Sequence, residues 1–93
     1  MYKLEFRKSA VKEWRKLGST IKEQFTKKLA SVLENPHIPS AALSGMPDCY
    51  KIKLRESGYR LVYQVRDQTV TVVIVAVGKR DRGEVYDKAK ERL

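Results

Sequence analysis

The chain has little of the chemistry on which most enzymes rely. Its 93 residues include one cysteine and one histidine, Cys49 and His37. A single cysteine excludes an internal disulfide, and the two residues together are too few for a cysteine–histidine zinc site. A glycine-rich phosphate loop and a pair of carboxylates on the predicted strands are also missing. We therefore expect no metal and no other cofactor, and we interpret Cys49 as a packed side chain and His37 as a solvated loop residue.

A long apolar segment is lacking as well. The longest one, residues 70–77, is far too short to span a bilayer. The N-terminus has no apolar core of signal-peptide length. Because a single cysteine also fits a reducing compartment, we expect a cytoplasmic protein. The length favours one small domain over residues 1–93.

Acidic residues are scarce relative to basic ones. The chain has 11 aspartates and glutamates against 20 lysines and arginines, which gives a net charge of +9. An excess of this size favours a polyanionic partner: nucleic acid, an acidic protein or an anionic membrane surface. The alternative is a basic protein that is merely solvated, although the cations also cluster along the chain.

Hydrophobic periodicity predicts the N-terminal half. Residues 2–7 alternate between apolar and charged side chains, as a half-buried strand does. We expect Ser9 to cap a short helix that ends at Gly18. Thr20 and Glu23 fit a capping box for a second helix, whose apolar stripe lies at residues 21, 25, 29 and 32. The two helices should therefore form a hairpin with a very short joint.

The C-terminal half predicts three strands and a helix. A loop at residues 37–48 precedes two strands of a hairpin, and the apolar run at 70–77 is typical of a central strand. Asp81 and Glu84 fit a capping box for a last helix. The chain is thus predicted to be an α+β domain with a small, mostly antiparallel four-stranded sheet. We expect the helical hairpin to pack on one face of that sheet and a helix to end the chain.

The most informative feature is a run of cations in the predicted hairpin. Successive side chains of a strand point to opposite faces, so Lys51, Lys53 and Arg55 share one face. A two-residue turn at 57–58 would place Arg55 opposite Arg60, on the same face. Like charges on neighbouring strands repel each other. A fold tolerates such a cluster most easily when an anion such as a phosphate backbone binds there.

Lysine, arginine and tyrosine are the reactive side chains that remain. RNA carries its own nucleophile, the ribose 2′-hydroxyl, so its cleavage needs a base, an acid and positive groups for the phosphorane. Arginine binds phosphate oxygens with two parallel hydrogen bonds. A lysine exchanges protons more readily when neighbouring cations lower its pKa. RNA cleavage without a metal is thus physically possible, but composition and spacing alone favour binding over catalysis.

Further cations extend the candidate surface. The outer face of the helical hairpin is basic, which fits either ordinary solvation or contact with a polyanion. Tyr86 is either a core aromatic that anchors the last helix or a group that leans back toward the sheet. The candidate residues for RNA or ribosome binding are Arg55, Lys79, Arg82, Lys12, Lys16, Lys22, Lys27 and Lys28.

Several segments carry a family resemblance that covers nearly the whole chain. They are KEWRKL (12–17), DCYKIKLR (48–55), SGYRLVYQV (57–65) and VGKR (77–80) with VY (85–86). Together they resemble the RelE family of bacterial toxins. That resemblance implies a compact fold related to microbial ribonucleases, and an endoribonuclease that cuts messenger RNA in the A site of the 70S ribosome without a metal.

The resemblance also implies a catalytic set and partners. Lys51, Lys53 and Tyr86 would share acid–base duties around the 2′-hydroxyl and the leaving oxygen. Arg60 and Arg80 would hold the scissile phosphate. A cognate antitoxin protein would wrap and inhibit the toxin, and through the antitoxin the pair would bind operator DNA and repress its own operon. No membrane partner is expected.

One segment departs from the family pattern. Related members read Lys-Leu-Arg-Gly before the second strand, whereas Ala42 and Ser44 replace the two cations here. Loss of two phosphate contacts should weaken docking by about one to two orders of magnitude at physiological salt. Two other functions stay open. One is a ParE-like toxin that poisons DNA gyrase and does not need the Lys–Arg–Tyr set, and the other is a plain RNA-binding module that does not cut.

Overall fold

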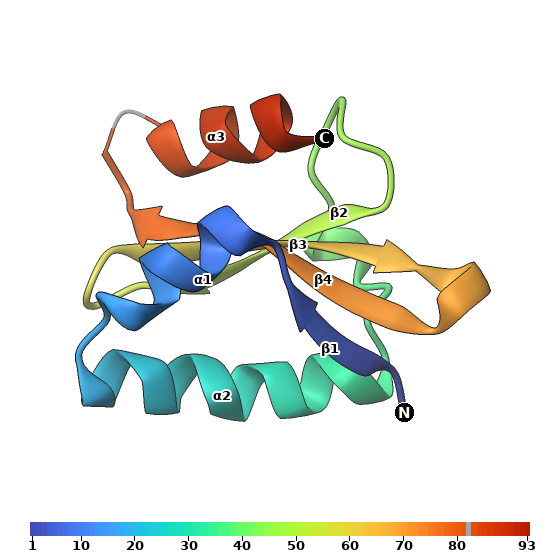
Figure 1. The fold of residues 1–93 in the computed structure, drawn as a ribbon, viewed down its shortest axis with the longest axis horizontal. Coiled ribbons are helices and arrows are strands. Elements are labelled where there is room, and N and C mark those ends of the chain that lie inside the picture. Colours follow the sequence, from blue (N-terminus) through green and yellow to red (C-terminus); the bar gives the residue numbers. More distant parts are fainter. Residues whose placement is uncertain (82) are drawn as a thin grey trace.

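A four-stranded sheet forms the middle of the molecule (Figure 1). The structure is a computed structural model and describes residues 1–81 and 83–93. The strands are β1 (Lys3–Phe6), β2 (Cys49–Leu54), β3 (Tyr59–Arg66) and β4 (Thr71–Lys79), in the spatial order β1-β4-β3-β2. The apolar run predicted as a central strand is indeed central, since β4 pairs with both β1 and β3.

The sheet is mixed, so the prediction of a mostly antiparallel sheet is only partly right. β2 pairs antiparallel with β3, and β3 antiparallel with β4, but β1 runs parallel to β4. Two helices separate β1 from the next strand of the chain. The connection from β1 to β4 also contains β2 and β3. A connection of that length lets β4 return beside β1 in the same direction, which a tight hairpin does not allow.

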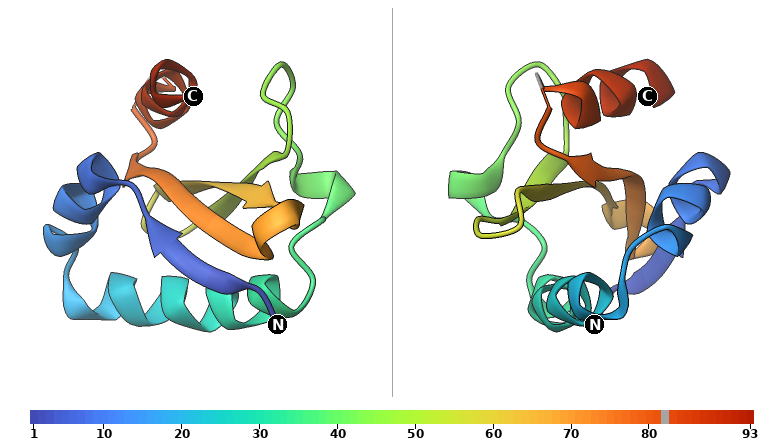
Figure 2. Two further views of the ribbon diagram at one scale, coloured as in Figure 1. Left: turned by 45° about the vertical axis from the view of Figure 1, so that its right-hand side comes forward. Right: turned by 90° about the vertical axis from the view of Figure 1, so that its left-hand side faces the viewer.

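Helices cover both faces of the sheet (Figures 1 and 2). α1 (Lys8–Arg15) and α2 (Ser19–Glu34) share one hydrophobic core with the sheet, and α3 (Glu84–Arg92) shares a second, smaller core with the opposite face. The predicted apolar stripe of α2 is confirmed, because Phe25, Leu29 and Val32 are buried. None of the helices described by the structure is long and apolar enough to cross a membrane.

The predicted caps of the first two helices are wrong. Ser9 lies inside α1, which begins at Lys8, and Gly18 precedes α2 instead of ending α1. Because α2 already begins at Ser19, Thr20 lies within the helix, and no side-chain hydrogen bond caps it. Glycine is tolerated at the position before a helix, so the chain can turn here without a side-chain cap.

The predicted cap of α3 is also wrong, although the helix itself is confirmed. α3 starts at Glu84, after Gly83 in the left-handed conformation with φ 73°, and no side-chain hydrogen bond caps it. The backbone N–H of Glu84 donates to the backbone carbonyl of Asp81 at 2.9 Å. A backbone turn therefore replaces the capping box.

The hairpin between β2 and β3 has a longer turn than predicted. Lys53 pairs with Arg60 and Leu54 with Tyr59, so residues 55–58 form the turn and Arg55 does not oppose Arg60. This register differs from the predicted one by two residues on β3. Because side chains alternate with a period of two, such a shift leaves every side chain on its predicted face. The cations of the hairpin therefore still share one face of the sheet.

Candidate active site

Five cations gather where the hairpin meets the end of β4. We call them the basic cluster: Lys51, Lys53, Arg55, Arg60 and Arg80. The cluster lowers the pKa of its central lysine, Lys53. The charge of Lys51 is the main cause, slight desolvation is the next, and the charges of Arg60, Arg55 and Arg80 add to the effect. A lysine in this position gives up its proton more easily than an isolated one.

Strand pairing and one backbone hydrogen bond position the cluster. Lys53 pairs across the hairpin with Arg60, and Arg60 pairs in turn with Gly78 of β4. Arg80 follows β4, and its backbone N–H donates to the carbonyl of Gly58 in the hairpin turn at 2.7 Å. Residues that lie far apart in the sequence therefore meet at one end of the sheet.

Arg60 is the most buried cation of the cluster. Its residue exposure is 6%, and its Nη1 atom donates to the carbonyl of Tyr59 at 3.0 Å. That hydrogen bond uses one of the five donors of a guanidinium group. A cation with so little water around it interacts more strongly with an anionic ligand than an exposed one does.

The positive charge of the cluster is not neutralised within the described residues. None of the five cations forms an ion pair in the parts of the chain that the structure describes, whereas Glu13 pairs with Arg92 and Lys88 elsewhere. The cluster therefore offers several charged donors on one surface. This arrangement suits a phosphate group, which carries negative charge on several oxygens.

Tyr86 lies on the helix that covers the same face of the sheet. It is half-buried and packs against the core beneath α3, which includes Val62 and Val85. Val62 pairs with Lys51 across the hairpin. Close packing of α3 on this face depends on Gly78, because a Cβ atom at that position would lie 3.1 Å from Val85 Cγ2. The structure thus brings Tyr86 to the face that carries the basic cluster.

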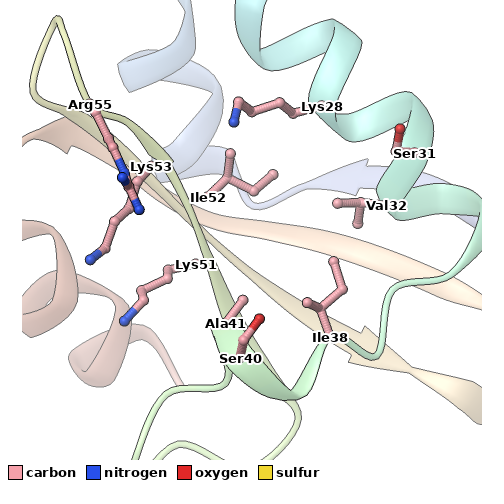
Figure 3. A pocket seen from close by; sticks show the side chains of 10 residues that line it. All are labelled: Lys28, Ser31, Val32, Ile38, Ser40, Ala41, Lys51, Ile52, Lys53 and Arg55. Carbon is pink, nitrogen blue, oxygen red and sulfur yellow. The ribbon is translucent and has the colours of Figure 1, made fainter.

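A hollow along the edge strand joins the cluster to α2 (Figure 3). Its sides include Lys28 of α2, whose side chain points toward β2, and apolar residues such as Ile52 and Ile38 form its floor. An adjoining hollow adds Lys27 and again includes Lys53. Two of the predicted helix cations therefore lie beside the basic cluster.

The remaining predicted binding residues do not line these two hollows. Lys79 pairs with Tyr59, and its Nζ atom lies 5.6 Å from the centre of that ring. Tyr59 packs on the core of α1 and α2, so Lys79 faces away from Arg60. Arg82 lies outside the described residues. Lys12 of α1, Lys16 just after α1 and Lys22 in the first turn of α2 are exposed or half-exposed, and none of them lines either hollow.

Sequence reasoning missed a hydrogen-bonded network at the other end of the sheet. We call Tyr2, His37, Tyr50 and Asp67 the polar network. His37 Nδ1 lies 2.8 Å from the Tyr50 hydroxyl and Nε2 lies 2.9 Å from Asp67 Oδ1, and the Tyr2 hydroxyl donates to the same carboxylate at 2.7 Å. His37 is therefore not merely solvated. Its partners lie 13 and 30 residues away, and no local pattern signals such contacts.

The network changes the acidity of its members. Hydrogen bonds from His37 and then from Tyr2 lower the pKa of the Asp67 carboxyl. Burial, followed by the negative charges of Asp48 and Asp67, raises the pKa of Tyr50. Both residues are thus held in the protonation states that they have at neutral pH. This suits a structural role better than proton transfer.

Cys49 is packed, as the sequence suggested. It is 1% exposed, and burial followed by the charge of Asp48 raises the pKa of its thiol to about 11. A thiol with this pKa is protonated at neutral pH and is a poor nucleophile. Among the described residues, no group of three or more histidine, cysteine, aspartate and glutamate side chains could hold a metal ion.

Comparison with known proteins gives a consistent result. The family described as "ParE toxin of type II toxin-antitoxin system, parDE" matches residues 4–83. The mRNA interferase toxin RelE of Escherichia coli K12 is 62% identical over 92 residues, which cover 99% of this chain and 97% of that protein.

Solved structures of RelE are also similar to this chain. The crystal structure of the isolated E. coli RelE toxin has a TM-score of 0.85 at 61% identity, covering 99% of this chain and 98% of that chain. The toxin chain of the intact E. coli RelBE toxin–antitoxin complex also gives a TM-score of 0.85, at 62% identity, covering 88% of this chain and 100% of that chain.

Proposed function

Because this chain belongs to the RelE toxins, within the ParE toxin family of type II toxin–antitoxin systems, we propose that it is an mRNA interferase that cuts messenger RNA in the ribosomal A site. The observation that supports this most directly is the basic cluster, whose cations share one surface without an ion pair among the described residues. We take residues 1–93 to act as one toxin domain in the cytoplasm, where ribosomes translate.

The proposed reaction is attack by the ribose 2′-hydroxyl on the adjacent phosphate. The O2′–P bond forms as the P–O5′ bond breaks, which leaves a 2′,3′-cyclic phosphate on one fragment and a 5′-hydroxyl on the other. A base removes the 2′-proton and an acid protonates the leaving oxygen. Lys51, Lys53 and Tyr86 share these two duties in the proposal, and the lowered pKa of Lys53 suits proton transfer.

Arginines stabilise the transition state in this proposal. Arg60 and Arg80 bind the scissile phosphate, whose negative charge increases as the phosphorane forms. The low exposure of Arg60 strengthens its interaction with that charge. The hydrogen bond between the Arg80 backbone and Gly58 keeps the second arginine beside the hairpin.

An antitoxin is the proposed protein partner. The E. coli RelBE complex holds a toxin chain that matches this one over 88% of its length. We propose that a cognate antitoxin binds this toxin through an acidic, amphipathic segment, which offsets part of the +9 charge. Through that antitoxin, the pair is proposed to bind operator DNA and to repress its own operon.

The two alternatives make different predictions. A ParE-like toxin would poison DNA gyrase and leave messenger RNA intact, and a plain RNA-binding module would bind without cutting. The family description names ParE, but the curated relative at 62% identity is an mRNA interferase. The identity over 99% of the chain therefore favours RNA cleavage.

Primer extension on programmed ribosomes tests the proposed site. Arg80→Ala and Tyr86→Ala should keep the fold and ribosome binding but lose cleavage. Arg66→Ala, which removes an exposed cation at the far end of β3, is the matched control and should cut normally. Undiminished cutting by both site variants would reject the site.

A modified messenger tests the chemistry. A single 2′-deoxynucleotide on the 5′ side of the scissile phosphate removes the proposed nucleophile and should abolish the cut, whereas the same change one codon away should not. The 3′ fragment should carry a 5′-hydroxyl and become labelled by polynucleotide kinase without phosphatase. Cleavage of the deoxy-substituted messenger at the same bond would exclude 2′-hydroxyl attack.

A further inference from the structure

α3 has a thin apolar contact with the sheet. Val85 and Ala89 are its buried residues, and both side chains are small. The N-terminal end of the helix has no side-chain cap. Yet this helix carries Tyr86, which must be held in place if it takes part in cleavage. The structure shows a polar contact at the other end of α3 that supplies this restraint.

Glu13 of α1 and Arg92 of α3 form a bidentate ion pair, which we call the clamp. Arg92 Nη1 donates to Glu13 Oε1 at 2.8 Å, and Nη2 donates to Oε2 at 3.1 Å. Lys88, one turn earlier in α3, lies 3.6 Å from the same carboxylate. Two parallel hydrogen bonds between charged groups fix orientation as well as distance.

The clamp also binds the part of the β4 edge that β1 leaves unpaired. β1 pairs with residues 71–74 of β4, and the next hydrogen bond runs from the Arg7 N–H to the Ile74 carbonyl. Beyond that point the clamp takes the place of a neighbouring strand. Glu13 Oε1 accepts from the Val77 N–H at 3.0 Å, and Arg92 Nη1 donates to the Val75 carbonyl at 2.8 Å.

Charge and burial make the clamp specific. The side chains of Arg92 and Glu13 are 21% and 16% exposed. Burial alone would raise the pKa of the Glu13 carboxyl, but the hydrogen bonds from Arg92 and from the Val77 N–H outweigh it and lower the pKa. Glu13 is therefore ionised at neutral pH. Loss of either partner would leave a half-buried charge without its counterion.

We propose that Glu13 and Arg92 are positioning residues for RNA cleavage, which hold α3, and with it Tyr86, against the face of the sheet that carries the basic cluster. The inference rests on the proposed function. Contacts at its two ends fix the position of α3. Val85 lies against Gly78 at its first turn, beside the strand position of Arg60, and the clamp fixes its last turn to α1 and β4.

Hydrogen exchange of the free toxin tests the clamp without reference to activity. Arg92→Ala and Glu13→Gln should raise the exchange rates of α3 amides by about tenfold or more, as expected for the loss of charge-assisted hydrogen bonds. Amides of β3, and those of β4 other than Val77, whose N–H donates to Glu13, should keep their protection. Arg92→Lys, which retains the charge but not the planar fork, should recover part of the protection. Lys90→Ala removes an exposed cation from the same last turn and is the matched control.

Cleavage kinetics test the positioning role. In single-turnover reactions on programmed ribosomes, Arg92→Ala should lower the rate constant at saturating toxin by about tenfold or more, because small misplacements of a reacting group are costly. The half-saturating toxin concentration should stay within about twofold of the wild-type value, since the variant leaves the basic cluster and the hollows beside it unchanged. Arg92→Lys should be faster than Arg92→Ala. If Arg92 acts through Tyr86, adding Arg92→Ala to a Tyr86→Phe variant should lower the rate constant little further.

These measurements test the positioning role of the clamp separately from the proposed RNA cleavage. Faster α3 exchange together with a rate loss that depends on Tyr86 supports the inference. Unchanged exchange in both clamp variants overturns it, and so does a rate loss that is fully additive with Tyr86→Phe. A wild-type toxin that does not cut at all would reject the proposed function, and the positioning role with it, whereas the exchange data would still show whether the clamp holds α3.

Discussion

The two ends of the sheet treat their polar side chains in opposite ways. At the turn between β3 and β4, the polar network pairs donors with acceptors: Asp67 binds His37 and Tyr2, and His37 also binds Tyr50. At the hairpin end, the five cations of the basic cluster form no ion pair among the described residues. One end is internally satisfied, and the other has an excess of one charge.

This difference supports the proposal that the hairpin end of the sheet binds a ligand. Carboxylates are available, since the chain has 11 of them, but Glu13 neutralises Arg92, and Asp67 binds His37, away from the cluster. Mutual repulsion in the cluster reduces the stability of the free protein. A bound phosphate reverses this effect, so the cluster is best explained by a phosphate ligand and the polar network by the fold.

The largest expected effect comes from removing the buried cation of the cluster. Arg60→Gln keeps a polar side chain but loses the charge that we propose faces the phosphate. It should lower the rate of cleavage by about 100- to 1000-fold, the usual cost of losing a transition-state donor. Single-turnover cleavage on programmed ribosomes measures this. The variant should remain folded, as judged by circular dichroism. A folded variant that cuts at the wild-type rate would show that the hairpin end does not differ from the polar network in its importance for cleavage.

A change beside the polar network should lower stability and leave cleavage unchanged. Tyr63 stacks on Tyr50 of the polar network with ring centres 5.4 Å apart, and its hydroxyl donates to the Pro36 carbonyl at 2.9 Å. Tyr63→Phe leaves that acceptor without its partner and should lower the free energy of unfolding by about 1–2 kcal/mol. Urea denaturation measures the loss. The rate of cleavage should stay within about twofold of wild type, since Tyr63 is not among the proposed reacting groups.

A smaller effect of opposite sign is expected for stability at the cluster. Lys53→Gln removes a charge whose pKa the neighbouring cations lower. It should raise the melting temperature slightly while it slows cleavage. Such a trade-off is typical of functional sites. Scanning calorimetry in low salt measures the shift, which added salt should reduce by screening the repulsion. A lower melting temperature would show that the cluster stabilises the free protein.

The smallest effect concerns pH. The pKa of Asp67 is lowered in the folded state by His37 and Tyr2, so its contribution to stability is complete above the unfolded value of about 3.9. That contribution is lost as the pH falls through the lower, folded value. Urea denaturation of the wild type and of Asp67→Asn between about pH 6 and pH 3 should show a smaller pH dependence in the variant. Equal slopes would contradict the proposed role of the network.

Much of the site could be predicted from the sequence, for a simple reason. The alternation of side chains along β2 and β3 places Lys51, Lys53 and Arg60 on one face in any register that differs by an even number of residues. The register itself was wrong because the turn spans residues 55–58 rather than two residues. The prediction of a shared cationic face therefore survived an error in the pairing.

Long-range features could not be predicted in this way. The parallel pairing of β1 with β4, the His37–Asp67 contact and the Glu13–Arg92 clamp join residues between 30 and 79 positions apart. Each depends on how the helices and strands pack, and leaves no local pattern. The helix caps failed for a different reason, because α2 and α3 both start directly after a glycine without a side-chain cap.

Mapping of mRNA 5′ ends in growing cells is the most direct test of RNA cleavage on the ribosome. After brief expression of the toxin, new 5′ ends should appear only within translated regions and at fixed positions relative to the reading frame. They should be absent when Arg60→Gln is expressed at the same level. Cuts spread equally over untranslated RNA, or growth arrest with intact messenger, would contradict the account.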